Sequence, residues 1–148
     1  MSATMHARRT RSDREQIEET LYRYASSIDA GDHERLRALL AEDARAKYGA
    51  RDWLEGADAV VAFIRDKGAD VGWQHHLLSV YHVDVEGDEA TALTYHTSYQ
   101  VTRERPDEAA VIVARYHDRL TRLDGRWLIR EKRMEIGWRE TRAGTSFL

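Results

Sequence analysis

Four long runs of alternating apolar and polar residues fill the second half of the chain, and they limit the fold more than any other feature. Such alternation is typical of strands that bury one face. Turn residues at 86–88 and 124–125 favour tight connections between antiparallel neighbours. The sequence therefore predicts an antiparallel meander, with strands expected over residues 76–85, 89–103, 109–123 and 126–137.

The first half shows helical periodicity instead. Ser12 and Glu15 have the spacing of a capping box, and apolar residues then recur every three or four positions. Gly31 is expected to end this helix. The remaining elements expected in this half are a helix over 33–40, a short strand over 44–48 and a third helix after Gly56.

Helices followed by a meander indicate an α+β fold, in which three N-terminal helices pack on one face of a strongly curved antiparallel sheet. A bent sheet covered on one side encloses a cone, whose open end can hold a ligand. No Gly/Ser-rich linker divides the chain, so we expect one domain over residues 12–148. Residues 1–11 are polar and basic, and we expect a disordered leader there.

Composition excludes several classes of function. The net charge is -3, from 23 Lys+Arg and 26 Asp+Glu, so no basic excess is available for a nucleic-acid backbone. The absence of cysteine excludes thiolate nucleophiles and suits a reducing, cytoplasmic location. No apolar run approaches the roughly 20 residues of a membrane span. Because the sequence has no phosphate-binding glycine loop and no His-x-x-x-His pair on a helix, we expect neither a cofactor nor a metal.

Asp29 and His76 are the main catalytic candidates. Asp29 falls at the end of the first expected helix, where the helix dipole disfavours negative charge, and His76 opens the first long strand. If both face one cavity, the carboxylate can orient an imidazole that accepts a proton at neutral pH. The alternatives are an aspartate that caps the turn at Gly31 and a histidine bonded to backbone. His75 must point the opposite way on a strand.

His96 lies in the middle of the second long strand. Period-two alternation places it on one face with Thr94 and Ser98. A polar face in a central strand indicates either a wet cavity or a solvated sheet surface. In the first case, His96 is a second titratable group for the same site.

Seven short motifs are spaced along residues 11–138: YASSIDAGD at 24–32, LLAEDA at 39–44, GADAV at 56–60, HH at 75–76, VDVEGDEA at 83–90, RYHDRL at 115–120 and DGRW at 124–127. In this order and spacing they resemble the SnoaL-like branch of the nuclear transport factor 2-like superfamily. The resemblance implies its α+β barrel, also described as cystatin-like. The superfamily includes dehydratases, a dehydrochlorinase, cyclases, isomerases and subunits without catalysis, so the fold alone does not assign a function.

The resemblance also implies site residues. The dehydratases and the dehydrochlorinase carry an aspartate and a histidine at the positions of Asp29 and His76. The dehydratases place a tyrosine, like Tyr24 or Tyr48, near the leaving group, and one has a second histidine that His96 resembles. Ordinary packing is the alternative for each tyrosine.

Other candidates are predicted to bind substrate. Val80 occupies a position where relatives often have a hydrogen-bonding asparagine. Trp53 and Trp73 are either core residues or pocket walls, and Trp73 is the better wall candidate because it precedes the histidine pair. Arg115 and Arg133 could hold a carboxylate or phenolate, unless they lie on the surface.

These features predict a cofactor-independent lyase that eliminates water or a similar leaving group from a small cyclic or polyketide-like apolar substrate. An isomerase or cyclase of the same fold is one alternative. A small-molecule-binding or assembly subunit without catalysis is another. By resemblance, we expect a homodimer or homotrimer, and no nucleic-acid or membrane partner.

Overall fold

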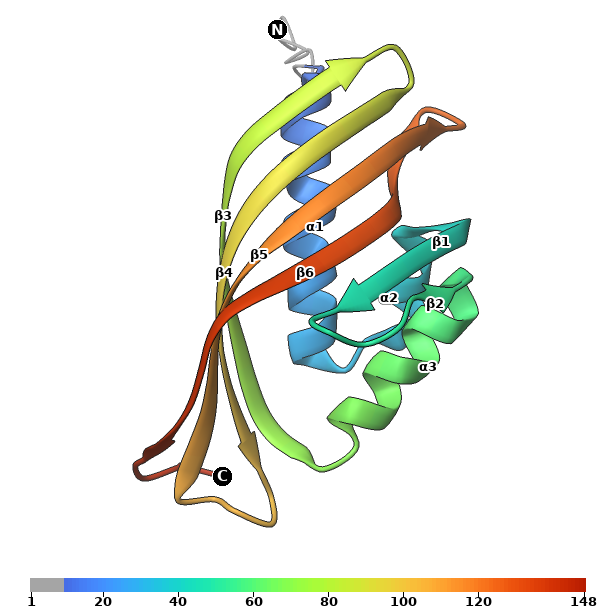
Figure 1. Cartoon of the computed structure of the whole chain (residues 1–148). Coiled ribbons are helices and arrows are strands. Elements are labelled where there is room, and N and C mark those ends of the chain that lie inside the picture. Colours follow the sequence, from blue (N-terminus) through green and yellow to red (C-terminus); the bar gives the residue numbers. More distant parts are fainter. Residues whose placement is uncertain (1–9) are drawn as a thin grey trace, which may run out of the picture.

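The computed structural model describes residues 10–148 (Figure 1). The leader expected over 1–11 therefore lies, apart from residues 10 and 11, outside the described residues. No helix in this part of the chain is long and apolar enough to cross a membrane. The elements confirm the α+β class and run in the order α1 (Asp13–Ala30), α2 (His33–Ala38), β1 (Leu40–Tyr48), β2 (Leu54–Glu55), α3 (Ala57–Gly68), β3 (Val71–Glu86), β4 (Glu89–Thr102), β5 (Glu108–Leu123) and β6 (Arg126–Ala143).

Local capping residues set both ends of helix α1. The Ser12 hydroxyl accepts from the Glu15 backbone N–H at 3.2 Å, and the Glu15 carboxylate accepts from the Ser12 N–H at 2.7 Å. This capping box satisfies two donors that a helix start leaves free. At the other end Gly31 adopts a left-handed conformation, with φ of 65°. The helix thus ends at Ala30 and leaves the Asp29 side chain in its final turn.

The sheet is mixed rather than antiparallel throughout. Strands β3 to β6 form the expected meander, but β1 pairs in parallel with β6, from Leu40 opposite Ile129 to Tyr48 opposite Met134. The strand expected over 44–48 starts at Leu40 because Leu40 and Ala41 are buried beside β6. For the same reason α2 ends at Ala38, before the expected position 40.

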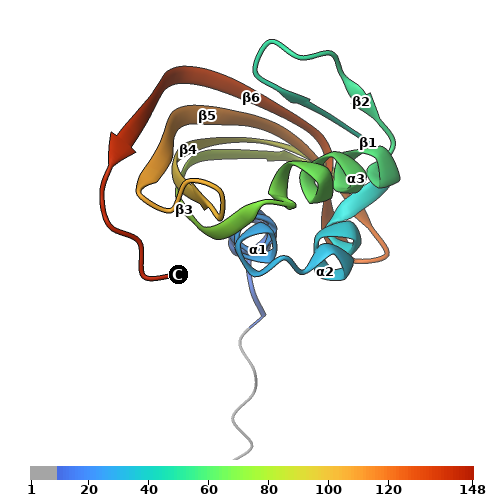
Figure 2. The same cartoon turned by 90° about the horizontal axis from the view of Figure 1, so that it is seen from below.

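The sheet is strongly curved and does not close into a barrel. Its strand order is β2-β1-β6-β5-β4-β3, and the edge strands β2 and β3 do not pair. Register shifts interrupt the β3–β4 and β5–β6 pairings, and such irregularities bend and twist strands. The helices lie on the concave side of the sheet (Figure 2). Helix α1 buries Ile17, Leu21 and Tyr24 against the inner sheet face, and this packing forms the core.

Candidate active site

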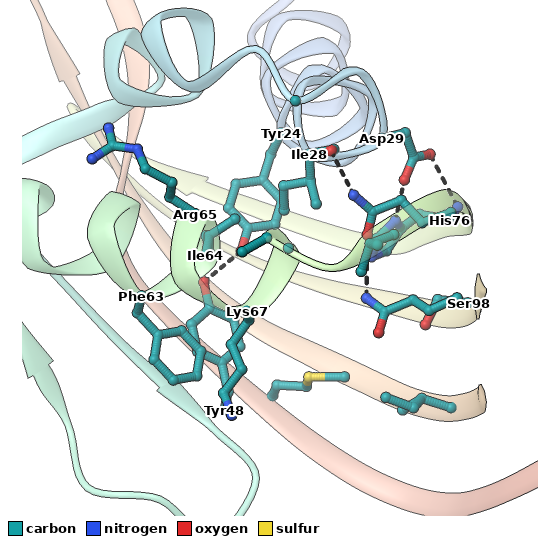
Figure 3. A pocket seen from close by; sticks show the side chains of 18 of the residues that line it. Tyr24, Ile28, Asp29, Tyr48, Phe63, Ile64, Arg65, Lys67, His76 and Ser98 are labelled. Atoms are coloured by element: carbon teal, nitrogen blue, oxygen red, sulfur yellow. Dashed lines mark hydrogen bonds and ion pairs between the residues drawn. The ribbon is translucent and has the colours of Figure 1, made fainter. Parts of the chain in front are cut away.

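A cavity of about 620 Å³ lies between the inner face of the sheet, the last turns of α1, and α3. The side chains labelled in Figure 3 line this cavity and come from α1, β1, α3, β3 and β4. The hydrophobic core packs beside it, between the helices and the sheet. The fold therefore leaves room for a small organic ligand on its concave side.

Asp29 and His76 meet at this cavity. The Asp29 Oδ1 lies 2.5 Å from the His76 Nδ1, and Oδ2 accepts from the His76 backbone N–H at 3.1 Å. One carboxylate thus holds both the ring and the main chain of the same residue. Because a carboxylate accepts hydrogen bonds, the neutral His76 ring carries its proton on Nδ1, where it donates to Asp29. The Nε2 of the ring then has a free lone pair. His75 points to the other face of β3 and stacks on Trp73, with ring centroids 5.6 Å apart.

A glutamine joins the end of α1 to β3 next to this pair. The Gln74 Nε2 donates to the Ile28 carbonyl at 2.8 Å, and the Gln100 Nε2 donates to the Gln74 Oε1 at 3.2 Å. The Ile28 carbonyl belongs to the last helical turn and also accepts from the Gly31 backbone N–H at 3.0 Å. Gln74 therefore fixes α1 against β3 at the height of Asp29. The sequence did not single out either glutamine, because a glutamine in a strand carries no signal of its own.

His96 is buried against His76. Its side chain is 3% exposed, and its ring stacks between those of His76 and Tyr116, at centroid distances of 5.2 Å and 4.8 Å. Thr94 and Ser98 are buried on the same face, which excludes the solvated sheet surface. Neither ring nitrogen of His96 has a hydrogen-bond partner within residues 10–148.

Burial, with the nearby His76 and Lys132, lowers the pKa of His96 to about 3. The ring is therefore neutral at physiological pH. It can donate or accept a hydrogen bond, but it cannot supply a proton as an imidazolium. This limits the role expected for His96 as a second titratable group.

The unfolding free energy is expected to fall as the pH drops from about 6.5 towards about 3. A histidine in the unfolded chain titrates near 6.5, whereas His96 in the folded protein titrates at about 3. The unfolded state therefore binds the proton first, and each pH unit in this window costs up to about 1.4 kcal/mol. Urea unfolding at a series of pH values measures the slope.

The variant His96→Gln should show a shallower slope than the wild type over this window. The exposed His82 serves as the matched control, since His82→Gln should leave the slope unchanged. Parallel curves for His96→Gln and the wild type would assign the pH dependence to other groups.

The two candidate tyrosines contact each other through their hydroxyls. The Tyr24 and Tyr48 oxygens lie 2.5 Å apart, and Tyr48 stacks on Phe63 at a centroid distance of 5.4 Å. Burial raises the pKa of both hydroxyls, so both stay protonated. In such a pair one hydroxyl donates to the other, and the acceptor keeps its own hydrogen for a third group. The pair can therefore donate one hydrogen bond to a ligand oxygen.

A buried ion pair lies behind the tyrosines. The Lys132 Nζ is 2.9 Å from both Asp118 oxygens, and both side chains are almost fully buried. The same ammonium lies 3.9 Å from the Tyr116 ring centroid and 4.4 Å from that of Tyr24. Burial raises the pKa of Asp118 and lowers that of Lys132, and the partner opposes each shift. The alternation of β5 and β6 places both residues on the inward face of the sheet.

Four residues predicted to bind substrate do not line the cavity. The Trp53 ring packs under Arg45, whose Cζ is 3.8 Å from its centroid. Val80 packs against the hydrophobic core. Arg115 pairs with Glu135 on the outer face of the sheet, and Arg133 lines a separate outer hollow. The structure therefore does not bring these four residues to the cavity.

Trp73 is among the residues that line the cavity, although its ring stacks on His75, which points to the other face of β3. It is 52% exposed, so the core alternative is wrong for this residue. Ser98 lines the cavity on the face of β4 that the alternation assigned to it. Phe63 and Tyr116 also line the cavity, although the sequence did not identify them as site residues. Only the packing of α3 and β5 against the other elements reveals the positions of these two residues. No group of three metal-ligating side chains occurs among the residues that the structure describes.

A family model for the SnoaL-like domain matches residues 9–133. The chain belongs to the SnoaL-like family. No curated protein matches the sequence significantly. Among solved structures, this SnoaL-like chain is similar to a scytalone dehydratase-like protein from Novosphingobium aromaticivorans DSM 12444, with 22% identity and a TM-score of 0.79, over 91% of this chain and 93% of the other.

It is also similar to LinA-type3, a hexachlorocyclohexane dehydrochlorinase from Novosphingobium barchaimii LL02. The identity is 16% and the TM-score 0.80, over 91% of this chain and 93% of that chain. A type 2 LinA matches with 16% identity and a TM-score of 0.81, over 91% and 92%. At these identities the structures share the SnoaL-like fold, and the function must be argued from the site.

Proposed function

We propose that this protein is a cofactor-independent lyase that eliminates water or a similar small leaving group from a small cyclic substrate. The observation that carries the proposal is the Asp29–His76 contact at the cavity wall. With Nδ1 engaged by the carboxylate, Nε2 is the free basic nitrogen of the ring. A positioned base of this kind typically contributes about 10²–10⁴-fold to a proton-transfer step.

The reaction starts with proton abstraction by His76. Its Nε2 takes a proton from a carbon next to a carbonyl or another activating group. The C–H electron pair becomes the new double bond, and the bond to the leaving group breaks with its electrons. Asp29 keeps the ring in the productive tautomer and stabilises the imidazolium that forms.

The tyrosine pair stabilises the departing oxygen by a hydrogen bond. The free hydrogen of the Tyr24–Tyr48 pair bonds that oxygen as negative charge develops on it. Both hydroxyls are weak acids here, because burial raises the pKa of each. The proton that completes the leaving water therefore returns from the His76 imidazolium. Neutral His96 stacks beside His76, and its ring N–H can donate a hydrogen bond to the bound substrate but not a proton.

An isomerase or cyclase is the second candidate, and the same observation favours it. If His76 holds the one mobile proton, it can return that proton to another carbon when no leaving group departs. The scytalone dehydratase-like and dehydrochlorinase neighbours favour elimination. Their names also suggest hydroxylated or halogenated rings as substrates to test.

A panel of hydroxylated and halogenated cyclic compounds, incubated in H2O and in D2O, separates the candidates. Mass spectrometry should find products that have lost water or hydrogen halide. Isomerisation would instead give a rearranged product of unchanged mass in H2O, which gains deuterium in D2O when the proton on His76 exchanges with solvent before it is returned. If bound compounds are recovered unchanged and without deuterium, the protein is a binding subunit and the proposed chemistry fails.

We also propose that the chain forms a homodimer or homotrimer through the convex sheet face. Leu77, Val113 and Trp138 are exposed there, and the strand register places them in one row across β3 to β6 with Thr97. Burying this row would remove apolar surface from water. The resemblance to the superfamily supports association through this face.

The variant Val113→Glu is expected to elute as a monomer in size-exclusion chromatography with light scattering, because it places a charge within the row. Val85 is similarly exposed near the β3–β4 turn, and Val85→Glu is the matched control that should keep the wild-type mass. A monomeric wild type would rule out the assembly.

A further inference from the structure

The mouth of the cavity carries an excess of positive charge. Among the described residues that line it, Asp29 is the one carboxylate, and it is already bonded to His76. The whole chain has more acidic than basic residues, with 26 against 23, so the local balance reverses the overall one. The cationic side chains in the lining are Arg51, Arg65, Lys67, Arg103 and Arg139.

Two of these cations flank one aromatic ring. The Arg51 Cζ lies 5.5 Å from the Phe63 centroid, and the Lys67 Nζ lies 5.8 Å from it. Phe63 stacks on Tyr48, whose hydroxyl contacts Tyr24. Figure 3 shows Lys67 beside Phe63 and Tyr48, whereas Arg65 points away from them. Arg51 and Lys67 thus lie near the edge of the same aromatic wall that leads to the proposed site.

Structural roles do not account for both charges. Lys67 is in the last turn of α3, where the helix dipole favours a cation. Arg51 comes from the segment after β1 and has no helix end to explain it. Neither residue forms an ion pair within residues 10–148. Two unpaired cations at a partly enclosed mouth create a field that attracts anions.

We propose that Arg51 and Lys67 form an anion-binding subsite, so that the substrate is a ring compound with an acidic side group. The ring enters over Phe63 and Tyr48 towards His76, and the acidic group stays at the mouth. This inference rests on the proposed function for the orientation of the ring, but binding itself needs no proton transfer. The anionic group is a carboxylate or a phosphate ester, since both bind arginine and lysine side chains.

Matched pairs of probes test the subsite. 2-Naphthoate and 2-naphthyl phosphate carry the anion, and 2-naphthamide and 2-naphthol are their neutral counterparts. Protein-observed NMR titration of the full chain at low salt should show both anions, or one of them, binding about 5-fold more tightly than the neutral counterpart. That factor corresponds to two solvent-exposed charge contacts. The preference should decrease with added salt.

Variants assign the preference to the two residues. Arg51→Gln with Lys67→Gln should reduce the anion preference to near 1, whereas the charge-conserving pair Arg51→Lys with Lys67→Arg should keep it. Arg126→Gln removes an exposed cation at the β5–β6 turn and should change nothing. His76→Gln should also keep the preference, so the loss of the base and the loss of the subsite give different results. Equal affinities within each pair, an unchanged preference in the double glutamine variant, or no binding of either anion would overturn the proposal.

Discussion

Replacing His76 with glutamine is expected to reduce turnover by about 10²–10⁴-fold, the range that a positioned general base contributes. Glutamine retains a polar side chain next to Asp29 but has no basic nitrogen to accept a proton. Initial rates on the compound identified in the screen measure the loss. Because only proton transfer is removed, the decrease should fall on kcat rather than on ligand affinity.

The adjacent histidine provides the matched control. His75 has the same side chain but lies on the other face of β3, stacked on Trp73. His75→Gln should keep nearly wild-type rates, and circular dichroism should confirm that both variants are folded. Turnover that persists at the wild-type rate in His76→Gln would remove His76 from the mechanism and leave the cavity a binding site.

Replacing Lys132 with methionine is expected to lower the unfolding free energy by about 3–5 kcal/mol. The variant removes the contacts between the Lys132 Nζ and the Asp118 oxygens, so Asp118 is left as an unpaired carboxylate in the core. It also removes the ammonium from the faces of the Tyr24 and Tyr116 rings. Urea unfolding near pH 7 measures the change.

The double variant Lys132→Met with Asp118→Leu should recover most of that loss, because replacing a buried pair with apolar residues is often neutral or stabilising. A solvent-exposed pair is the control: Arg14→Met breaks the Arg14–Glu18 contact on α1 and should cost about 0.5 kcal/mol or less. A similarly small cost for Lys132→Met would mean that the core tolerates the unpaired carboxylate.

The α+β class and most of the meander could be predicted because they depend on local pattern. The capping box at Ser12, the stop at Gly31 and the alternation of β4 and β5 each act within a few residues. The parallel pairing of β1 with β6 could not be predicted, because it joins residues about ninety positions apart through packing alone.

The positions of the candidate residues were predicted in part. The resemblance directed attention to Asp29 and His76, and strand alternation separated His76 from His75. Alternation also indicated that His96 lies inward, but not that both of its nitrogens lack partners and its pKa is lowered. Arg115 and Arg133 lie away from the cavity, because residue type alone does not say which sheet face a side chain occupies.

The sequence by itself determined the order of the elements, the ends of α1 and the inward face of the central strands, since caps, turns and period-two patterns are local. Only the tertiary structure decided which side chains share the cavity, that Lys132 and Asp118 pair beneath two tyrosines, and that Arg51 and Lys67 flank Phe63. Those contacts depend on how far the sheet curves and where α3 packs against it. Both are set by the summed packing of the whole core, which no short stretch of sequence encodes.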